Sequence, residues 1–445
     1  MSDAESSAQH SVRLSPQASA QLQKLPLPSP ASGEDMVGAV FHDTQDRALR
    51  RRGLTLSRSA EPERGWLLSI PEGDDHWAVE VPRLRSAPQR LPAALTQVLS
   101  GIVGQAELIE IDDDADQAPD ADDSAKAARK AKQKMASAKK AGEPTGVDVL
   151  QAVLAQQAAA LEMWDLKAGL DLPDALHQLR VTARSLRGLL KSARPFLDRE
   201  SVDELGERLQ QLGRSLSQAR DAEVVAELLP QRAAELQGRV SEKTAQALAQ
   251  AAQKHSETSA AKVRGGAQSE RTATLQLARA IAQEPPFTDK GRKKAAGLTP
   301  RQMSDQLVRR ALRKATKETD RALAAARDEE LDAAQRLEHL HTVRKATKRV
   351  RYVAKVLRAA GFRPSKPVRK LGKAAQKAQD ALGKTMDTAL STAWLQDGAA
   401  GMRRAGADPY ELGLLTGVEL QSLAHGIDAG DEIVARLARR LEQHS

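Results

Sequence analysis

The pattern of apolar and polar residues changes once along the chain, near residue 147. From Val147 to the C-terminus, apolar residues recur at the three- and four-residue spacing of amphipathic helices. The start Pro173-Asp174 and the stop Gly361 fit this pattern. Prolines and glycines over 284–302 predict a break between two helical halves. The predicted helices are 147–167, 174–196, 200–228, 231–284, 303–330, 334–360, 366–400, 408–425 and 429–443.

In residues 37–111 apolar and polar residues alternate instead. The strings WLLSIP and WAVEV place apolar side chains at every second position, which predicts strands. Residues 1–36, rich in Ser, Gln and Pro, are predicted to be a disordered tail. Residues 112–146 hold a block of aspartates followed by a block of lysines, which predicts a flexible, solvated linker. Its acidic block lacks the glycine and terminal glutamate of a calcium loop, so no metal site is predicted there.

Two of the predicted helices carry positive charge where an apolar seam is expected. The segments are HQLRVTARSLRGLLK, from His177, and HTVRKATKRVRYVAK, from His341. Aligned on their histidines, both carry basic residues at offsets 3, 7, 10 and 14, and neither contains an acid. In a helix these offsets fall within an arc of about 80°, and they are the seam positions of a heptad. Each helix is therefore predicted to bury one face and to present a cationic row on another.

The two segments belong to an internal repeat, because their histidines are 164 residues apart and matching strings follow both. These strings are LSQARD, ending at Asp221, and LGKTMD, ending at Asp387. The repeat predicts two duplicated helical bundles related by a pseudo-twofold axis. The two aspartates fit equally well as groups that orient an arginine of the cationic rows and as ordinary ion pairs at helix ends. They are therefore left outside the predicted site.

Composition narrows the class of partner. The formal net charge is +9 and the pI is near 9.6, which favours a polyanion: nucleic acid, an anionic membrane or a phosphate polymer. The absence of cysteine excludes disulfides and thiolate metal sites and favours a reducing compartment. The N-terminal sequence has no apolar signal region, and no apolar run approaches the roughly 20 residues that span a bilayer. We therefore expect a soluble, cytoplasmic protein without membrane contact.

The segment FHDTQDRALRRRGLTLSRS resembles the motif of CYTH domains, the triphosphate tunnel family. The family's opening strand has no counterpart before Val37, and Ser57 and Ser69 stand where basic residues are expected. We therefore expect a degenerate, truncated CYTH-like module, small and β-rich or α+β, over residues 37–111. The matching positions are Phe41, Asp43, Thr44, Asp46, Leu49, Gly53, Leu56, Arg58, Trp66 and Pro71.

The doubled histidine segments and the strings LSQARD and LGKTMD look like the signatures of CHAD domains (conserved histidine α-helical domains), over about 147–443. CYTH followed by CHAD is a known architecture. Ser217 replaces the usual glycine, and Met386 replaces an arginine. The resemblance implies a mainly α fold of duplicated four-helix bundles over 147–445, with halves 147–284 and 303–445 joined by the loop 285–302.

The same resemblance implies a basic groove that binds inorganic polyphosphate, and association with polyphosphate granules. The implied polyphosphate-binding residues are His177, Arg180, Arg184, Arg187, Lys191, His341, Arg344, Lys345, Lys348, Arg351 and Lys355. A further basic group has no counterpart in the first half and would extend the groove. It comprises Arg309, Arg310, Arg313, Lys314 and Lys317.

Two alternative functions stay open. One is a nucleic-acid-binding helical protein, although of the few aromatic residues only Tyr352 lies within a basic row, whereas single-strand binders use aromatic stacking platforms. The other is triphosphatase activity retained by the CYTH-like module. The sequence carries no P-loop, no HExxH and no nucleophile elbow. We therefore expect a binding protein and not an enzyme, with no catalytic residues, no cofactor and no metal.

Overall fold

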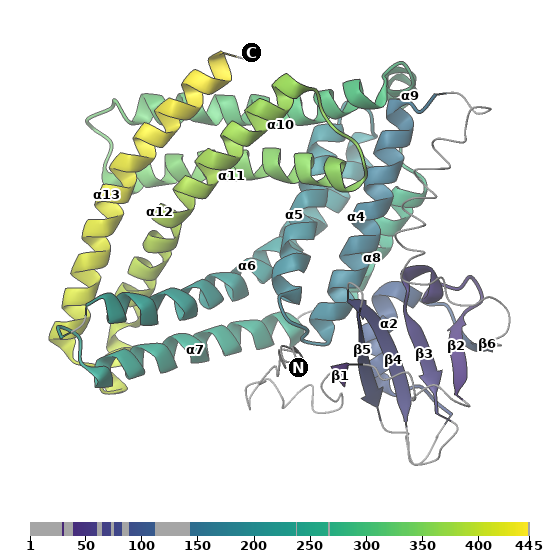
Figure 1. Cartoon of the computed structure of the whole chain (residues 1–445), viewed down its shortest axis with the longest axis horizontal. Helices are drawn as coiled ribbons and strands as arrows, with labels where there is room; N and C mark the ends of the chain where they lie inside the picture. Colours follow the sequence, from purple (N-terminus) through teal and green to yellow (C-terminus); the bar gives the residue numbers. More distant parts are fainter. Residues whose placement is uncertain are drawn as a thin grey trace, which may run out of the picture.

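The computed structural model describes residues 29–30, 39–59, 65–72, 75–81, 89–111, 143–236, 238–265 and 268–443. The predicted disordered tail lies outside these residues except for its described strand Ser29–Pro30, and the predicted charged linker lies outside them up to residue 142. The described chain is mainly helical, with a small antiparallel sheet near the N-terminus (Figure 1). This coarse fold class is as the sequence predicted.

The sheet has six strands in the order β1-β5-β4-β3-β2-β6, and each neighbouring pair is antiparallel. The predicted alternation is confirmed, because Trp66, Leu68 and Ile70 of β4 are buried together on one face. The strands are β1 (Ser29–Pro30), β2 (Val40–Thr44), β3 (Thr55–Arg58), β4 (Trp66–Glu72), β5 (Asp75–Val81) and β6 (Leu108–Ile111), with the 3-10 turn η2 (Arg50–Arg52) and helix α2 (Ala93–Val103) between them.

The helical region begins at α4 and runs to α13. Side-chain caps define several starts, including a capping box at Thr145 and Asp148 before α4 and another at Asp332 before α11. The helices are α4 (Gly146–Gly169), α5 (Ala175–Ala193), α6 (Arg199–Glu235), α7 (Glu242–Gly265), α8 (Gln268–Gln283), α9 (Asp289–Ala296), α10 (Pro300–Ala325), α11 (Ala333–Ala359), α12 (Lys366–Arg404) and α13 (Pro409–Glu442).

Four predictions about where helices begin and end are wrong, and packing explains two of them. Helix α6 continues through Pro230 because the residues on both sides, Leu229 and Ala233, are buried in a core. The predicted helix 231–284 is two helices, α7 and α8. The predicted connecting loop 285–302 contains helix α9, whose start is capped by the Thr288 side chain, and the first turn of α10. The predicted interruption at 426–428 is absent, because Gly426 brings α13 close to Thr385 of α12, whose hydroxyl donates to the Gly426 carbonyl at 3.1 Å. A glycine in a helix can serve close packing instead of ending the helix.

Four helices form a closed frame. Helix α5 contacts α6, α6 contacts α12, α12 contacts α11, and α11 returns to α5. Figure 1 shows these four as the sides of a quadrilateral, with α4, α7, α13 and α10 running beside α5, α6, α12 and α11 respectively. Both cationic segments therefore lie on sides of the frame, on α5 and α11. The pseudo-twofold relation between the two halves stays a prediction.

Two hydrophobic cores hold the frame. The larger joins the buried face of the sheet to α2, α4, α5, α10 and α11, so the N-terminal module and the helical part share one core. The smaller lies where α6, α7, α12 and α13 meet, and it includes Leu229, Leu248 and Leu395. The two cores lie at different corners of the frame: one where α5 meets α11, and the other where α6 meets α12. They fix the positions of the four helices that surround its interior.

Candidate anion-binding site

The cationic rows of α5 and α11 converge where the two helices meet. Arg180 and Arg184 of α5 and Arg344 and Lys348 of α11 are all half-buried. The charges of Arg180 and Arg184 lower the pKa of Lys348 across the helix boundary, and that of Arg184 also lowers the pKa of Arg344, which places the four within one electrostatic cluster. We call these four residues the central cluster. The structure thus brings together two segments that are 164 residues apart in sequence.

Burial and like charges perturb the ionisation of the central cluster. Burial, and then the neighbouring charges of Arg344, Arg184 and Arg180, lower the pKa of Lys348 from 10.5 to about 7. Burial, and then Arg184, lower the pKa of Arg180 to about 10. Packing four cations in a half-buried position is unfavourable in the absence of a counter-charge. The cluster is therefore suited to receiving an anion.

Several guanidinium donors in the site have no partner. The Nε atoms of Arg180, Arg187, Arg344 and Arg349 are buried and make no hydrogen bond to any described residue, and the same holds for Nδ1 of His177. A buried unsatisfied donor costs roughly 1–3 kcal/mol, and more when it is charged. The fork of an arginine is well matched to phosphate oxygens, which would satisfy such donors on contact.

The remaining predicted residues extend the rows at both ends. His177, Arg187 and His341 are half-buried, whereas the other four are exposed. Burial lowers the pKa of both histidines, and next in importance Asp174 opposes this at His177 while Lys345 reinforces it at His341. The exposed four are Lys191, Lys345, Arg351 and Lys355. Lys355 lies one helical turn beyond Arg351 and away from the central cluster.

The side chains of α6 and α12 support the rows in equivalent ways. Arg187 donates to Gln210 of α6, and Arg351 donates to Gln379 of α12 at 3.2 Å. Arg187 and Arg351 occupy the same offset from their histidines. The hydroxyl of Ser217 accepts from Arg184 at 2.6 Å. These contacts orient the cationic side chains from the adjacent sides of the frame, α6 for the row on α5 and α12 for the row on α11.

Asp221 and Asp387 face the central cluster, a role that the sequence pattern did not favour over an ordinary ion pair. Burial raises the pKa of the Asp387 carboxyl, while the charges of Arg344 and Lys348 oppose the rise. Asp221 in turn acts on the ionisation of Arg180. The signal that could have included both aspartates was the repeat itself, because they end the strings LSQARD and LGKTMD.

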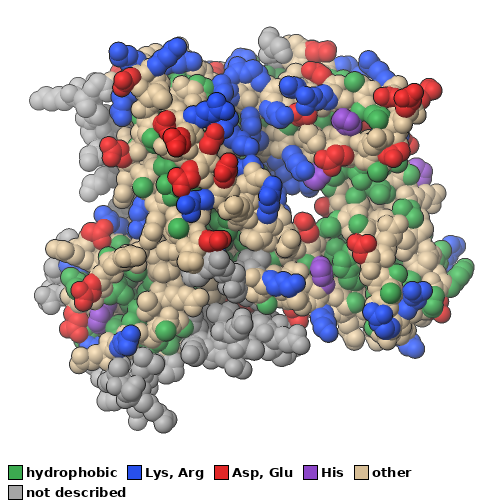
Figure 2. Space-filling view, turned by 180° about the vertical axis from the view of Figure 1, so that it is seen from behind, with side chains coloured by type: hydrophobic (Ala, Val, Ile, Leu, Met, Phe, Trp, Pro, Cys, Tyr) green, Lys and Arg blue, Asp and Glu red, His purple; other side chains and the backbone are tan. Residues whose placement is uncertain are grey.

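Sequence reasoning missed two arginines of the site. Arg349 lies within the second segment but off its row, and it reaches across Gly188 of α5. Arg220 of α6 lies near His177 and Arg180, and it is paired with Glu223 at 3.0 Å and Glu227 at 3.3 Å. Neither position matches a basic residue at the equivalent place in the other half. Figure 2 shows lysine and arginine side chains gathered on the back face beside an opening in the surface.

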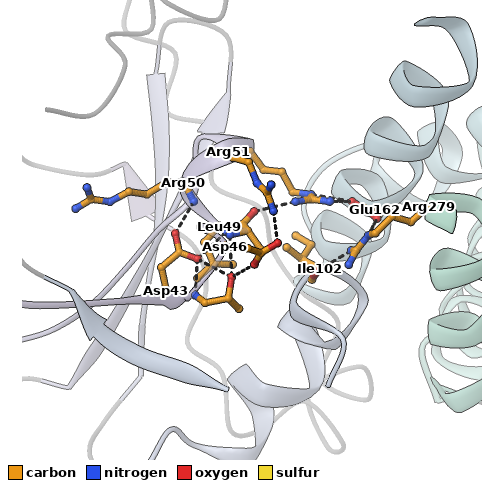
Figure 3. Close-up of polar contacts among 11 residues, drawn as sticks. Asp43, Asp46, Leu49, Arg50, Arg51, Ile102, Glu162 and Arg279 are labelled. Carbon is orange, nitrogen blue, oxygen red and sulfur yellow. Dashed lines mark hydrogen bonds and ion pairs between the residues drawn. The ribbon is translucent and has the colours of Figure 1, made fainter. Parts of the chain in front are cut away.

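The CYTH-like motif of the N-terminal module uses its polar atoms within a single turn (Figure 3). The Asp43 carboxylate accepts from the backbone nitrogens of Thr44, Leu49 and Arg50 at 2.7–2.9 Å. The Thr44 hydroxyl accepts from Ala48 N at 2.9 Å and donates to Asp46 at 2.6 Å. These contacts hold the turn between β2 and η2. The membership of this module in the CYTH family stays a prediction.

Two further features concern the described residues as a whole. None of their helices is both long and apolar enough to cross a membrane. Among the same residues, no three histidine, aspartate or glutamate side chains gather as a metal site would require.

The fold and the site together define a helical protein with a half-buried cationic cluster. The model of the CHAD domain family matches residues 151–396, more than half of the chain, and the chain therefore belongs to the CHAD domain family. Two uncharacterized proteins from two strains of Mycobacterium tuberculosis are each 28% identical over 280 residues, which cover 62% of this chain. The chain spans about half the length of these relatives, 50% in each case.

Two solved structures are similar at low identity. PptA from Streptomyces chartreusis is 20% identical with a TM-score of 0.47, over 68% of this chain and 100% of that one. The CHAD domain from the plant Ricinus communis is 21% identical with a TM-score of 0.46, over 65% of this chain and 91% of that one.

Proposed function

We propose that the protein binds inorganic polyphosphate at the central cluster and holds it without cutting it. The CHAD family is associated with polyphosphate binding in general. The observation that carries the proposal for this chain is the convergence of four half-buried cations. The pKa values of Arg180, Arg344 and Lys348 are lowered, and the Nε donors of Arg180 and Arg344 have no partner among the described residues. A flexible polymer with a charge on each phosphate would supply counter-charge to all four at once, beyond the two carboxylates of Asp221 and Asp387 that face them.

Single-stranded nucleic acid is the alternative of another class. It requires aromatic side chains on which bases stack. In the described part of the site Tyr352 is the aromatic residue near Arg180 and Arg344. Trp164 and Trp394 lie elsewhere, near Lys167 and His255 respectively. Polyphosphate presents no bases and therefore fits the cluster better. Association with polyphosphate granules follows from the same proposal.

A titration tests the proposed function. The full chain is expected to bind long-chain polyphosphate at least about tenfold more tightly than single-stranded DNA of matched charge at one fixed salt concentration, because the site lacks stacking platforms. Isothermal titration calorimetry measures both affinities, and phosphate release is followed in the same samples. The full chain is required because the sheet and the helices share one core. Equal affinity for the two polymers would contradict the proposal.

The low pKa of Lys348 makes binding depend on pH. In the free protein this amine loses its proton near pH 7, and a bound polyanion raises its pKa. Binding above pH 7 must therefore take up a proton. The affinity is expected to fall by up to about tenfold per pH unit as the pH rises from about 7 to 9. Titrations of the protein across this range with long-chain polyphosphate measure the slope.

The variant Lys348→Arg is the control for this dependence, because arginine stays charged over the same range. The pKa values of His177 and His341 are lowered from 6.5, so both histidines titrate on the acidic side of this range. Burial raises the pKa of the Asp387 carboxyl, which also faces Lys348. An unchanged slope in the arginine variant would show that Lys348 is not the titrating group.

A further inference from the structure

A second group of cations lies where α5, α10 and α11 meet. It comprises Lys191 and Arg194 at the end of α5, Arg310 and Arg313 of α10, and Arg349 of α11, and we call it the α10 cluster. Arg349 links α11 to α10, because its Nη2 donates to the backbone oxygen of Arg310 at 3.2 Å. A Cβ on Gly188 would lie 3.2 Å from Arg349 Cγ, so the glycine lets this side chain cross α5.

The α10 cluster is continuous with the central cluster. Arg187 connects them, because it lies near Arg184 on one side and near Lys191 and Arg349 on the other. Each of Arg187, Lys191 and Arg349 has its pKa lowered by burial and then by neighbouring cations. Positive charge is therefore continuous from one cluster to the other. Figure 2 shows basic side chains running across the back face toward the opening.

Little negative charge compensates the α10 cluster. Asp203 of α6 pairs with Arg194 and, at 3.6 Å, with Arg199. The Nε of Arg349 is buried without a partner among the described residues. Arg313 is exposed and Arg310 half-buried, so both are accessible to a large solute. The cluster therefore has the same character as the central one: crowded positive charge with free donors.

We propose that the α10 cluster extends the polyphosphate path and makes the protein favour long chains over short ones. This inference rests on the proposed function. Arg184 and Arg194 are ten residues apart on α5, which corresponds to about 15 Å along a helix. A tripolyphosphate ion is shorter than this span, so it contacts one cluster at a time. A long chain contacts both, and the second contact is intramolecular and strengthens the first.

The double variant Arg310→Gln/Arg313→Gln tests this extension in the full chain. Its affinity for long-chain polyphosphate is expected to fall about tenfold, which lies within the range expected for the loss of two ion pairs at the surface. The slope of the logarithm of the binding constant against the logarithm of the salt concentration should become shallower by one to two. The affinity for tripolyphosphate should stay within about twofold of the wild type. Calorimetric titrations of both ligands at several salt concentrations measure all three quantities.

The matched control is Arg439→Gln/Arg440→Gln. It removes the same charge from exposed positions in a separate groove between α12 and α13. If this control loses as much affinity for long chains, net charge alone explains the loss and the extension is wrong. An equal loss for tripolyphosphate in the Arg310 variant would also overturn it. Failure of the wild type to bind either phosphate would instead overturn the proposed function, so the two failures are distinguishable.

Discussion

Replacing Arg180, Arg184, Lys348 and Arg351 by glutamine is expected to weaken polyphosphate binding at least about a hundredfold and to abolish the preference over single-stranded DNA. Hydrogen bonds to charged groups contribute roughly 1.5–3 kcal/mol each. The loss of two such bonds therefore costs at least about 3 kcal/mol of binding free energy, which is more than a hundredfold in affinity. Titration calorimetry with long-chain polyphosphate at fixed salt measures the loss. Far-UV circular dichroism checks that the helices persist.

The fold is expected to survive this substitution and to become more stable without ligand. The substitution removes mutual repulsion among half-buried cations, which is the cause of the lowered pKa values of Arg180 and Lys348 after burial. A variant with four exposed arginines changed to glutamine controls for net charge. These are Arg403, Arg404, Arg439 and Arg440. A comparable loss of binding in this control would refute a localised site. So would wild-type affinity in the variant that lacks Arg180, Arg184, Lys348 and Arg351.

The second large effect is expected at the junction of the sheet and the helices. Glu162 of α4 is 1% exposed and accepts from Arg52 Nε at 2.7 Å and from Arg279 Nε at 2.6 Å. Arg279 also donates to the backbone oxygens of Gly101 and Ile102 in α2 at 2.8 and 2.7 Å. Figure 3 shows Glu162 beside Arg279, where the N-terminal module meets the helical part.

The substitution Glu162→Ala is expected to lower the free energy of unfolding by about 3 kcal/mol, because it leaves two largely buried guanidinium groups without their carboxylate. Urea denaturation followed by circular dichroism measures the change. Polyphosphate affinity should be unaffected under conditions where the variant is folded.

The control for this prediction is Glu204→Ala. Glu204 pairs with Arg208 at 3.0 Å on the exposed surface of α6, and loss of such a pair changes stability by less than about 1 kcal/mol. Equal effects of the two substitutions would mean that the buried junction contributes no more than a surface ion pair.

Local sequence signals predicted most elements, and they failed where packing overrode them. The alternation around Trp66 predicted strand β4 correctly, and Gly361 follows the end of α11 with a positive φ of 85°. Pro230 and Gly426 looked like breaks but lie inside helices. Their neighbours bury apolar surface or approach another helix closely, and no single-helix pattern reveals that gain.

The candidate site divides in the same way. Both cationic rows were predicted from the offsets within each segment, because a helix converts fixed spacing into one face. The contribution of Arg349 was not predictable, because it depends on how α11 crosses α5 at Gly188. Nor was the placement of Asp387 beside Arg344 and Lys348, which requires α12 to close the frame.

The sequence by itself determined the helical character, the doubled segments and the sign and spacing of the charge on each row, since these are properties of local periodicity. The tertiary structure alone decided that the rows meet, that carboxylates from α6 and α12 face them, and that Lys348 is crowded enough for its pKa to fall to about 7. The physical reason is that burial and electrostatic repulsion depend on distances between residues far apart in the chain.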